Sequence, residues 1–394
     1  MPAEGARRPA WVEIDLEALR HNAAALAAIA APARLCAVVK ADAYGHSAVP
    51  VARAALEGGA SALAVALVDE GVELRRGGLS APILVLSEPA PEAMDEVVAH
   101  HLSPALYTLE GVAAARRAVA GAGLEAPLEV EVKVDTGMHR VGASPEQVGE
   151  IVEAVVAADE LAYAGLFTHF AVADERGDGF TAEQVARFEK VRAELKASGL
   201  PEPDHVHAAN SAGTIAWPEA RYDMVRCGIA LYGYAPAPEL GPVLAAELAR
   251  VGHDRLRPVL SWKARVTLTR QYEAGERLSY GRRLALPSRS VVAVVPLGYA
   301  DGVQRSYFQA GGEVLIGGRR CPLAGSVTMD QIVVSCGPEA AVRPGDLAVL
   351  IGSDGEEEIT AEEWAQRLDT IPYEIVTRIG PRVPRRFVDS LEVR

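Results

Sequence analysis

The stretch Leu35–Ser47, "LCAVVKADAYGHS", sets an apolar run directly against Lys40 and follows it with Tyr44. A short apolar run of this kind between polar segments is typical of a buried β-strand. A lysine at the end of such a strand is costly to bury in its charged form. Taken alone, Lys40 fits either a reactive amine or a strand-end lysine whose ammonium reaches water.

The scarcity of lysine favours a chemical role for Lys40. Five of the 39 basic residues are lysines, and arginine supplies the rest. Arginine stays protonated, whereas lysine can lose its proton and act as a nucleophile. We therefore interpret Lys40 as a residue whose reactivity arginine could not replace.

The pattern around this strand repeats along the first part of the chain. Strand-like runs alternate with Ala-rich amphipathic helical patterns, beginning with a helix that follows Asp15, its predicted N-cap. Eight strand–helix units over about 230 residues predict an α/β fold with a (β/α)8 TIM-like barrel. The predicted strands are LCAVVK, ALAVAL, PILVLS, LSPALY, LEVEVKVD, LAYAGLFTH, HVHAAN and DMVRCGIALYG.

The sequence pattern changes after the alternating strand and helix segments of the predicted barrel. Residues 233–258, with spaced prolines and glycines, are typical of a linker, and consecutive strand patterns with tight turns follow from about residue 259. We expect one helix there, in "TAEEWAQRLDTI". The predicted domains are a flexible tail at 1–10, a barrel at 11–240 and a mostly β C-terminal domain at 241–394.

Composition limits the function classes. The 394 residues carry a net charge of −14, which disfavours nucleic-acid and anionic-membrane partners. We find no run of roughly 18 apolar residues and no secretory signal pattern. The four cysteines have no CxxC spacing, so we expect reduced thiols in a cytoplasmic protein.

Cationic side chains follow several of the predicted barrel strands. In a parallel barrel the carboxyl ends of the strands meet at one mouth, where reactive groups lie. Cations converging there predict an anionic ligand, most simply a phosphate or carboxylate. Arg226 carries the strongest signal, because a buried arginine needs partners and the following Gly228 allows close approach of an anion. The candidates at this mouth are Lys40, Tyr44, Lys133, Asp135, Arg140, His169, Asn210, Ser211, Arg226 and Gly228.

Structural explanations compete with these assignments. Asp135 also fits a turn cap, and His169 also fits a satisfied core histidine. His205 and His207 alternate onto one strand face, but we identify no third ligand and expect no metal site. The dinucleotide, P-loop, GxSxG and HExxH motifs are absent from the sequence.

Taken together, these residues resemble the alanine racemase family of fold-type III pyridoxal-phosphate enzymes. The resemblance covers nearly the whole chain and both predicted domains. It implies a barrel that holds the cofactor and a β domain that completes the active site of the partner subunit in a homodimer. The matching motifs are WVEIDLEALRHN, AVVKADAYGHS, VKVDTGMHRVG, FTHFAVAD, HAANSAGT, VRCGIALYG, LSYGRR, PLGYADG, SVTMDQ and IPYEIVTRIGPRVPR.

The resemblance assigns roles to individual residues. It implies that Lys40 bonds to the aldehyde of pyridoxal 5'-phosphate, and that Lys40 and Tyr280 of the partner chain are the two catalytic bases. Arg226 matches the residue facing the pyridine nitrogen, with His169 orienting it, and Arg140 reaches the cofactor phenolate and the substrate carboxylate. The other cofactor-binding matches are Tyr44, Asn210, Ser211, Gly228, Ile229 and Tyr373.

The remaining matches concern the substrate entrance. Met329, Asp330 and Tyr299 match partner-chain residues that line it and narrow the pocket, and Lys133 matches a lysine that is often carbamylated. The motif "SVTMDQ" departs from the family at Ser326 and Thr328, where arginine and cysteine are common. That departure leaves the substrate range less defined than the reaction.

The implied activity is interconversion of L- and D-alanine, supplying D-alanine for cell-wall synthesis. A broad-specificity amino-acid racemase of the same fold is the alternative. A fold-related decarboxylase is disfavoured by Arg226, because such relatives place a carboxylate opposite the pyridine nitrogen. A silent PLP-binding protein is disfavoured by the extra β domain that bears Tyr280.

Overall fold

The computed structural model describes residues 8–123 and 126–389. Residues 1–7 of the expected tail lie outside the described part. The chain divides into two compact units, each described by itself below. Of the described residues, the first unit comprises 8–17, 44–47 and 258–389, and the second comprises 18–43, 48–123 and 126–257.

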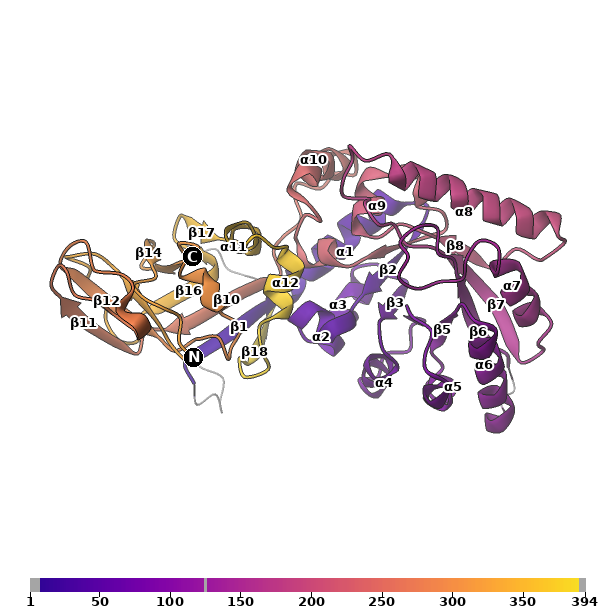
Figure 1. The fold of residues 1–394 in the computed structure, drawn as a ribbon, viewed down its shortest axis with the longest axis horizontal. Coiled ribbons are helices and arrows are strands. Elements are labelled where there is room, and N and C mark those ends of the chain that lie inside the picture. The colour runs from indigo at the N-terminus through magenta and orange to yellow at the C-terminus, as the bar shows by residue number, and fades with distance from the viewer. Residues whose placement is uncertain (1–7, 124–125, 390–394) are drawn as a thin grey trace. The chain divides into compact units, whose positions relative to one another are not determined.

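The second unit is a closed barrel of parallel strands, seen in Figure 1 with its helices on the outside. The last strand pairs back with the first, with Cys36 opposite Arg226, so the sheet has no free edge. This closure confirms the predicted TIM-like fold, and each predicted strand-like run overlaps one barrel strand. The strands are β2 (Arg34–Val38), β3 (Ala62–Val65), β4 (Ile83–Val85), β5 (Ser103–Leu106), β6 (Leu128–Lys133), β7 (Leu161–Phe167), β8 (His205–His207) and β9 (Met224–Cys227).

Helices with one apolar stripe cover the barrel. In α7 the buried residues Val148, Ile151, Val152 and Val155 recur at helical spacing, which places them on one face. Asp15 caps the first helix as predicted, since its Oδ1 accepts the N–H of Glu17 at 3.0 Å. The helices are α1 (Leu16–Ala30), α2 (Lys40–Gly45), α3 (Ala48–Glu57), α4 (Val68–Arg76), α5 (Met94–Ala99), α6 (Leu109–Ala122), α7 (Val148–Val156), α8 (Phe180–Ala197), α9 (Ser211–Ala216) and α10 (Gly241–Arg250), with 3-10 turns η1 (Pro91–Ala93), η2 (Pro218–Ala220), η3 (Ile229–Tyr232) and η4 (Pro238–Leu240).

The predicted linker at 233–258 is wrong in its middle, where helix α10 forms. Leu244 and Leu248, four residues apart, are buried on one face of this helix. Glu247 of the same helix forms an ion pair with Arg221 at 2.9 Å. Two of the prolines that suggested a linker, Pro238 and Pro242, lie at the start of helical segments, where proline is tolerated. Residues 241–257 therefore group with the barrel.

The first unit is mostly β and contains two sheets. Its larger sheet has the order β14-β13-β16-β10-β1-β18, with β17 on β16, and its smaller sheet has the order β11-β12-β15. Strand β1 was not among the predicted strands, and it pairs with β10 from a distant part of the chain. The strands are β1 (Ala10–Asp15), β10 (Leu260–Arg265), β11 (Leu268–Tyr272), β12 (Ser290–Val295), β13 (Glu313–Ile316), β14 (Arg320–Pro322), β15 (Ile332–Ser335), β16 (Leu347–Asp354), β17 (Glu357–Ile359) and β18 (Arg385–Val388).

An aromatic cluster forms the centre of the first unit. Tyr307 stacks on Trp364 with ring centroids 3.8 Å apart, and Trp262 lies 5.8 Å from the same ring. The indole of Trp364 donates to the carbonyl of Leu350 at 3.0 Å, which satisfies its buried N–H. Trp364 lies on the predicted helix, α11 (Ala361–Leu368). The other short helical segments of this unit are η5 (Tyr280–Arg282), η6 (Arg305–Tyr307) and α12 (Pro372–Thr377).

Within the described residues, we find no helix with the length and apolar character needed to cross a membrane.

Candidate active site

The carboxyl ends of the barrel strands bring basic side chains together, as the sequence predicted. Lys40 follows β2, Lys133 ends β6 and Arg226 lies in β9. Lys133, Arg140 and His169 line one small cavity of about 10 Å³. Each cation in this group makes it harder for its neighbours to carry charge. The site is therefore one where lysine amines lose protons easily.

Lys40 is partly buried, and its pKa is lowered. Burial is the largest cause, and the charge of Arg140 adds to it, while Glu70 acts in the opposite direction. Desolvation and a neighbouring cation both disfavour the ammonium form. The position at the end of an apolar strand thus favours the neutral, nucleophilic amine of Lys40.

The chain after Lys40 forms an unusual left-handed turn. Residues 41–44 all have φ between 52° and 54°, in the left-handed helical region. Each L-residue costs roughly 1–2 kcal/mol there, so surrounding contacts must hold the turn. Asp42 accepts the N–H of Ala48 at 2.8 Å and thereby closes the turn. Gly45 comes next at φ 80°, where a Cβ would lie 2.7 Å from the Val376 carbonyl oxygen.

Glu70 supports this turn from helix α4. One of its carboxylate oxygens accepts the N–H of Ala41 at 2.6 Å. The other accepts the N–H groups of Ala66 at 2.8 Å and Leu67 at 3.1 Å, where α4 begins. A single carboxylate therefore fixes the residue next to Lys40 and the start of a helix.

Lys133 has the most strongly shifted lysine pKa of the site. Burial and then the charges of Arg226, Arg140 and Lys40 lower its pKa to about 7. Its Nζ donates to the carbonyl of Leu86 at 2.9 Å. Near neutral pH a large fraction of this amine is therefore uncharged.

The loop after β6 presents Arg140, and Asp135 holds that loop in shape. The Oδ1 atom of Asp135 accepts the N–H groups of Gly137 at 2.9 Å and His139 at 3.0 Å. These contacts match the turn-cap role that the sequence left open for Asp135. Asp135 thus positions Arg140 through the backbone.

Arg226 is 3% exposed, and its buried guanidinium has several partners. Its Nη1 donates to Nδ1 of His207 at 2.6 Å, and its Nη2 donates to the carbonyls of Thr168 at 2.8 Å and Ala208 at 3.0 Å. The Nδ1 of His169 lies 3.2 Å from Nη2. Burial lowers the pKa of Arg226 to about 10, so it remains protonated at neutral pH.

The sequence did not reveal the chain of contacts behind Arg226. Because the guanidinium donates to Nδ1 of His207, the proton of the neutral imidazole lies on Nε2. That Nε2–H donates to a carboxylate oxygen of Glu131 at 2.5 Å. Burial lowers the pKa of His207 to about 4, which keeps the ring neutral at pH 7. Glu131, His207 and Arg226 therefore form one hydrogen-bonded chain inside the barrel.

Glu131 also supplies the third group that seemed missing beside His205 and His207. Potential ligand atoms of these three residues lie within 4.8 Å of one another. Both nitrogens of His207 are already engaged, one as acceptor from Arg226 and one as donor to Glu131. His207 thus has no lone pair left for a metal ion, and we interpret the cluster as a positioning network for Arg226.

Backbone and hydroxyl groups gather after strands β8 and β9. Ser211 Oγ accepts the N–H of Gly228 at 2.9 Å, and Ile229 begins the 3-10 turn η3 beside it. Asn210 caps helix α9, where its side chain accepts the N–H of Gly213 at 2.9 Å. Of the residues predicted here, Ser211, Gly228 and Ile229 therefore lie together, and Asn210 shapes the helix start next to them.

The remaining predicted residues belong to the first unit. Tyr44 and Tyr373 have ring centroids 6.0 Å apart. Tyr280 is 73% exposed, and Ser326 Oγ donates to its carbonyl oxygen at 3.0 Å. Ser326, one of the departures from the family pattern, thus supports the backbone of Tyr280.

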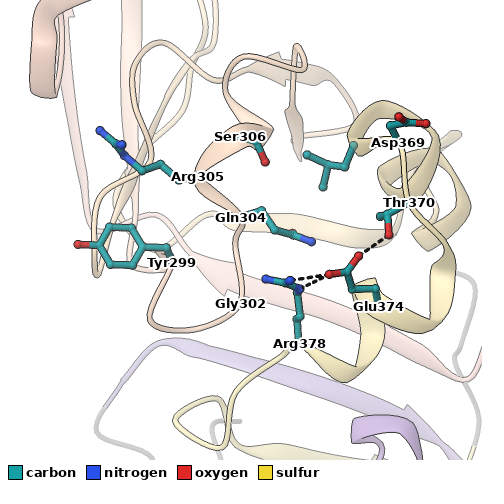
Figure 2. A pocket seen from close by; sticks show the side chains of 10 residues that line it. Tyr299, Gly302, Gln304, Arg305, Ser306, Asp369, Thr370, Glu374 and Arg378 are labelled. Carbon is teal, nitrogen blue, oxygen red and sulfur yellow. Dashed lines mark hydrogen bonds and ion pairs between the residues drawn. The ribbon is translucent and has the colours of Figure 1, made fainter.

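The predicted entrance residues of this unit are also exposed or on cavity walls. Met329 is 53% exposed, and the carboxylate of Asp330 accepts from Arg382 at 2.7 Å. Figure 2 shows Tyr299 on the wall of a polar cavity of about 500 Å³. Glu374 in that cavity accepts from Arg378 at 2.9 Å.

Comparisons with known proteins agree with this geometry. The family descriptions "Alanine racemase, N-terminal domain" and "Alanine racemase, C-terminal domain" match residues 14–236 and 259–387. The alanine racemase of Symbiobacterium thermophilum is 48% identical over 381 residues, covering 96% of this chain and 97% of that protein.

Solved structures extend the likeness to the fold. The crystal structure of alanine racemase from D-cycloserine-producing Streptomyces lavendulae has a TM-score of 0.88 and 39% identity, covering 98% of this chain and 99% of that one. A histidine racemase from Leuconostoc mesenteroides has a TM-score of 0.85 and 28% identity, covering 98% of this chain and 99% of that one. Both domains, in the same order and over nearly the full length, are therefore shared, and the chain belongs to the alanine racemase family of isomerases.

Proposed function

We propose that this protein interconverts L- and D-alanine by a two-base mechanism with bound pyridoxal 5'-phosphate. Lys40 serves one face of the substrate, and Tyr280 of the partner subunit serves the other. The observation that carries the proposal is the lowered pKa of Lys40, which lies beside further cations at the mouth of a barrel typical of this family. The proposed setting is the cytoplasm, where D-alanine supplies cell-wall synthesis.

The described residues fit this cofactor. Lys40 offers an amine for its aldehyde. The Ser211 hydroxyl, whose oxygen accepts from the Gly228 N–H, can donate its own proton to the phosphate, and the backbone of Ile229 lies at the start of η3 beside it. Tyr44, Tyr373 and the Asn210 helix start complete the set carried over from the family. When bound, the cofactor would withdraw electrons from the substrate and make its Cα proton acidic.

Lys40 is proposed to exchange the Cα proton at its Nζ atom. A general base must lose its own proton near neutral pH, and the lowered pKa of Lys40 moves it towards that condition. Arg140, whose charge contributes to that shift, is proposed to bind the carboxylate of alanine. One cation would then serve both substrate binding and base strength.

Arg226 is proposed to face the pyridine nitrogen with a hydrogen-bond donor. With a pKa of about 10, its guanidinium keeps its protons at neutral pH and does not protonate a ligand. Such a partner favours simple proton exchange over decarboxylation, which needs a stronger electron sink. The chain through His207 to Glu131 supports this role, because it leaves the guanidinium little freedom to turn.

Tyr280 is proposed to act in the site of a partner subunit. Large side chains that stay exposed on one unit are typical of surfaces that another chain covers. Tyr280 is 73% exposed, Met329 53% and Tyr299 45%. We therefore propose a homodimer in which each chain completes the other's site.

Carbamylation of Lys133 fits the same proposal. Carbon dioxide reacts with a neutral amine, and the pKa of about 7 leaves much of Lys133 neutral at physiological pH. The resulting anion would pair with Arg140, and one negative charge would offset some of the cations nearby. Protein equilibrated with ¹³C-bicarbonate should show a carbamate resonance that Lys133→Arg removes. Its absence from the unmodified chain would remove this part of the proposal.

A broad-specificity racemase is the second candidate, because a histidine racemase shares the fold over 98% of this chain. Thr328 lies in the motif that departs from the family, and its hydroxyl donates to the carbonyl of Gln331 at 2.8 Å. Initial rates with alanine, serine, lysine, arginine and histidine separate the two candidates. A preference for alanine supports the first, and comparable rates support the second.

The direct test of the proposal is an absorbance spectrum of the purified protein before and after D-alanine. We expect a band near about 420 nm that borohydride removes and that D-alanine perturbs. Tyr280→Phe should keep this band and lose proton exchange at Cα. Protein without the band after incubation with pyridoxal 5'-phosphate would contradict the proposal.

A further inference from the structure

Two cysteines of the first unit lie directly opposite each other on neighbouring strands. Cys321 belongs to β14, and Cys336 follows the end of β15. Leu323 and Val334 form an antiparallel bridge between these segments. In an antiparallel register, two steps back from Leu323 and two steps forward from Val334 bring Cys321 opposite Cys336.

The hydrogen bonds around this pair define its type. Ala324 N–H donates to the Val333 carbonyl at 2.8 Å, so Ala324 and Val333 are a hydrogen-bonded pair. Opposite residues of antiparallel strands alternate between hydrogen-bonded and non-hydrogen-bonded pairs, and three steps along this register Cys321 and Cys336 form a non-hydrogen-bonded pair. The N–H of Cys336 points the other way, since it donates to Val291 of β12 at 2.8 Å. In such a pair the Cα atoms are about 4.5 Å apart, within the range that a disulfide spans.

We propose that Cys321 and Cys336 are a redox-active dithiol that a low-molecular-weight disulfide converts into an intramolecular disulfide. The proposal goes beyond the racemase activity and does not rest on it. Both thiols are free in the structure, so the reduced form is the starting state.

The two thiols differ in a way that assigns their roles. The Cys321 S–H donates to the Arg319 carbonyl at 3.7 Å. The contact between the two thiols lowers the pKa of Cys336 and raises that of Cys321. Cys321 is 3% exposed, whereas Cys336 is partly exposed. Cys336 is therefore the thiolate that a reagent in solution can reach.

The reaction balances in two steps with glutathione disulfide as the oxidant. The Cys336 thiolate attacks one sulfur of glutathione disulfide, its S–S bond breaks, and one glutathione leaves as a thiolate that takes up a proton. Cys321 then loses its proton and attacks the Cys336 sulfur, and the second glutathione leaves. The protein has lost two hydrogens, and one glutathione disulfide has become two glutathione thiols.

The disulfide would connect parts of the unit that matter for the proposed site. Strand β14 lies at the edge of the larger sheet and β15 at the edge of the smaller one, so the bond would join the two sheets. The segment between the cysteines carries Met329 and also Ser326, which donates to the Tyr280 carbonyl. Closing this loop would restrict the segment that supports Tyr280.

The test uses the full-length folded protein incubated with glutathione disulfide, then alkylated and measured by mass spectrometry. We expect the loss of two alkylation sites and a peptide cross-linked between Cys321 and Cys336. The Tm should rise by about 5 °C, because the bond restricts the unfolded chain.

Single variants separate the two steps. Cys321→Ser should stop with one glutathione on Cys336, and Cys336→Ser should acquire neither adduct nor cross-link. Cys36→Ala is the matched control and should cross-link like the unmodified chain, since Cys36 is 0% exposed inside the barrel. Full alkylation of both thiols after the incubation, with cross-linking only in the unfolded chain, would overturn the proposal. A cross-link that survives in Cys336→Ser would overturn it as well.

Discussion

The barrel mouth and the exposed face around Tyr280 present their functional side chains in opposite states. At the barrel mouth, Arg226 is 3% exposed and its guanidinium donates to a histidine and to backbone carbonyls. In the β-rich unit, Tyr280 is 73% exposed and Met329 is 53% exposed. The side chain in the first region is positioned by contacts within its own chain, whereas the proposed base of the second region, Tyr280, is exposed to solvent. This difference fits the proposed homodimer, in which each chain supplies a prepared half of one site and the second half of its partner's site.

The largest effect is expected from a substitution that removes the reactive amine at the barrel mouth but keeps a cationic side chain there. Lys40→Arg keeps a long cationic side chain but cannot supply a neutral amine near pH 7. We expect racemisation to fall by about 10³-fold or more, measured by chiral chromatography in both directions. Lys263→Arg is the control, because Lys263 forms a 2.5 Å ion pair with Glu13 that arginine can also make. Equal rates for Lys40→Arg and the unmodified chain would exclude Lys40 as a base.

The second expected effect is a loss of stability in acid that comes from the buried barrel interior. The folded pKa of His207 is about 4, and its unfolded value is about 6.5. Between these values the unfolded chain binds a proton that the folded chain does not, so the folded state loses stability as pH falls through this window. The loss is roughly 3 kcal/mol, and above about pH 6.5 His207 contributes no slope.

Urea unfolding midpoints measured from pH 7 to pH 4 check this sign. His207→Gln should flatten the dependence, because an amide keeps a donor and an acceptor but does not titrate. A stability that rises as the pH falls through this range would show that His207 is charged in the folded protein.

The third expected effect separates positioning from catalysis behind Arg226. Glu131→Gln removes the charge that accepts the Nε2–H of His207, and an amide accepts more weakly than a carboxylate. We expect kcat to fall about 10-fold, which corresponds to about 1.4 kcal/mol, with a smaller change in KM. The pH profile of kcat should shift as well, because the partner of a titrating histidine has changed.

Glu129→Gln is the matched control for this change, since Glu129 lies on the same strand and is exposed. A similar fall in kcat for both variants would mean that the chain through His207 does not act on Arg226.

Much of this arrangement could be predicted from the sequence, and the failures have physical causes. Most barrel strands are short, largely apolar runs between helical patterns, so the local pattern identified them. Strand β1 was missed because its partner β10 lies about 250 residues away, and pairing at that distance leaves no local signal. Helix α10 was hidden by prolines that also fit helix starts.

For the candidate site too, residues with a local sequence signal were predicted, and residues whose role depends on distant contacts were missed. Lys40, Lys133 and Arg226 were identified because a charge at a strand end is visible in the sequence. Glu131 was missed, although the alternation "LEVEVK" sets Glu131 on the same strand face as Lys133. The left-handed turn at 41–44 had no signal, since it depends on the distant carboxylate of Glu70.

The smallest expected effect tests that turn. Glu70→Gln replaces a carboxylate that accepts three backbone N–H groups with an amide. One of these N–H groups belongs to Ala41, the residue after Lys40. We expect the free energy of unfolding to fall by about 1 kcal/mol. Glu73→Gln, an exposed change on the same helix, is the control for chemical denaturation. Equal midpoints for the two variants would remove Glu70 as a support of the turn.

Subunit mixing tests most directly whether each chain completes its partner's site. Lys40→Ala and Tyr280→Phe chains, each inactive alone, are refolded together in equal amounts with pyridoxal 5'-phosphate. Random pairing makes half of the dimers hybrids, and one site in each hybrid has both Lys40 and Tyr280. We expect recovery of about a quarter of the unmodified activity. Activity no higher than the sum of the two separate variants, in mixtures that contain hybrid dimers, would contradict the shared site.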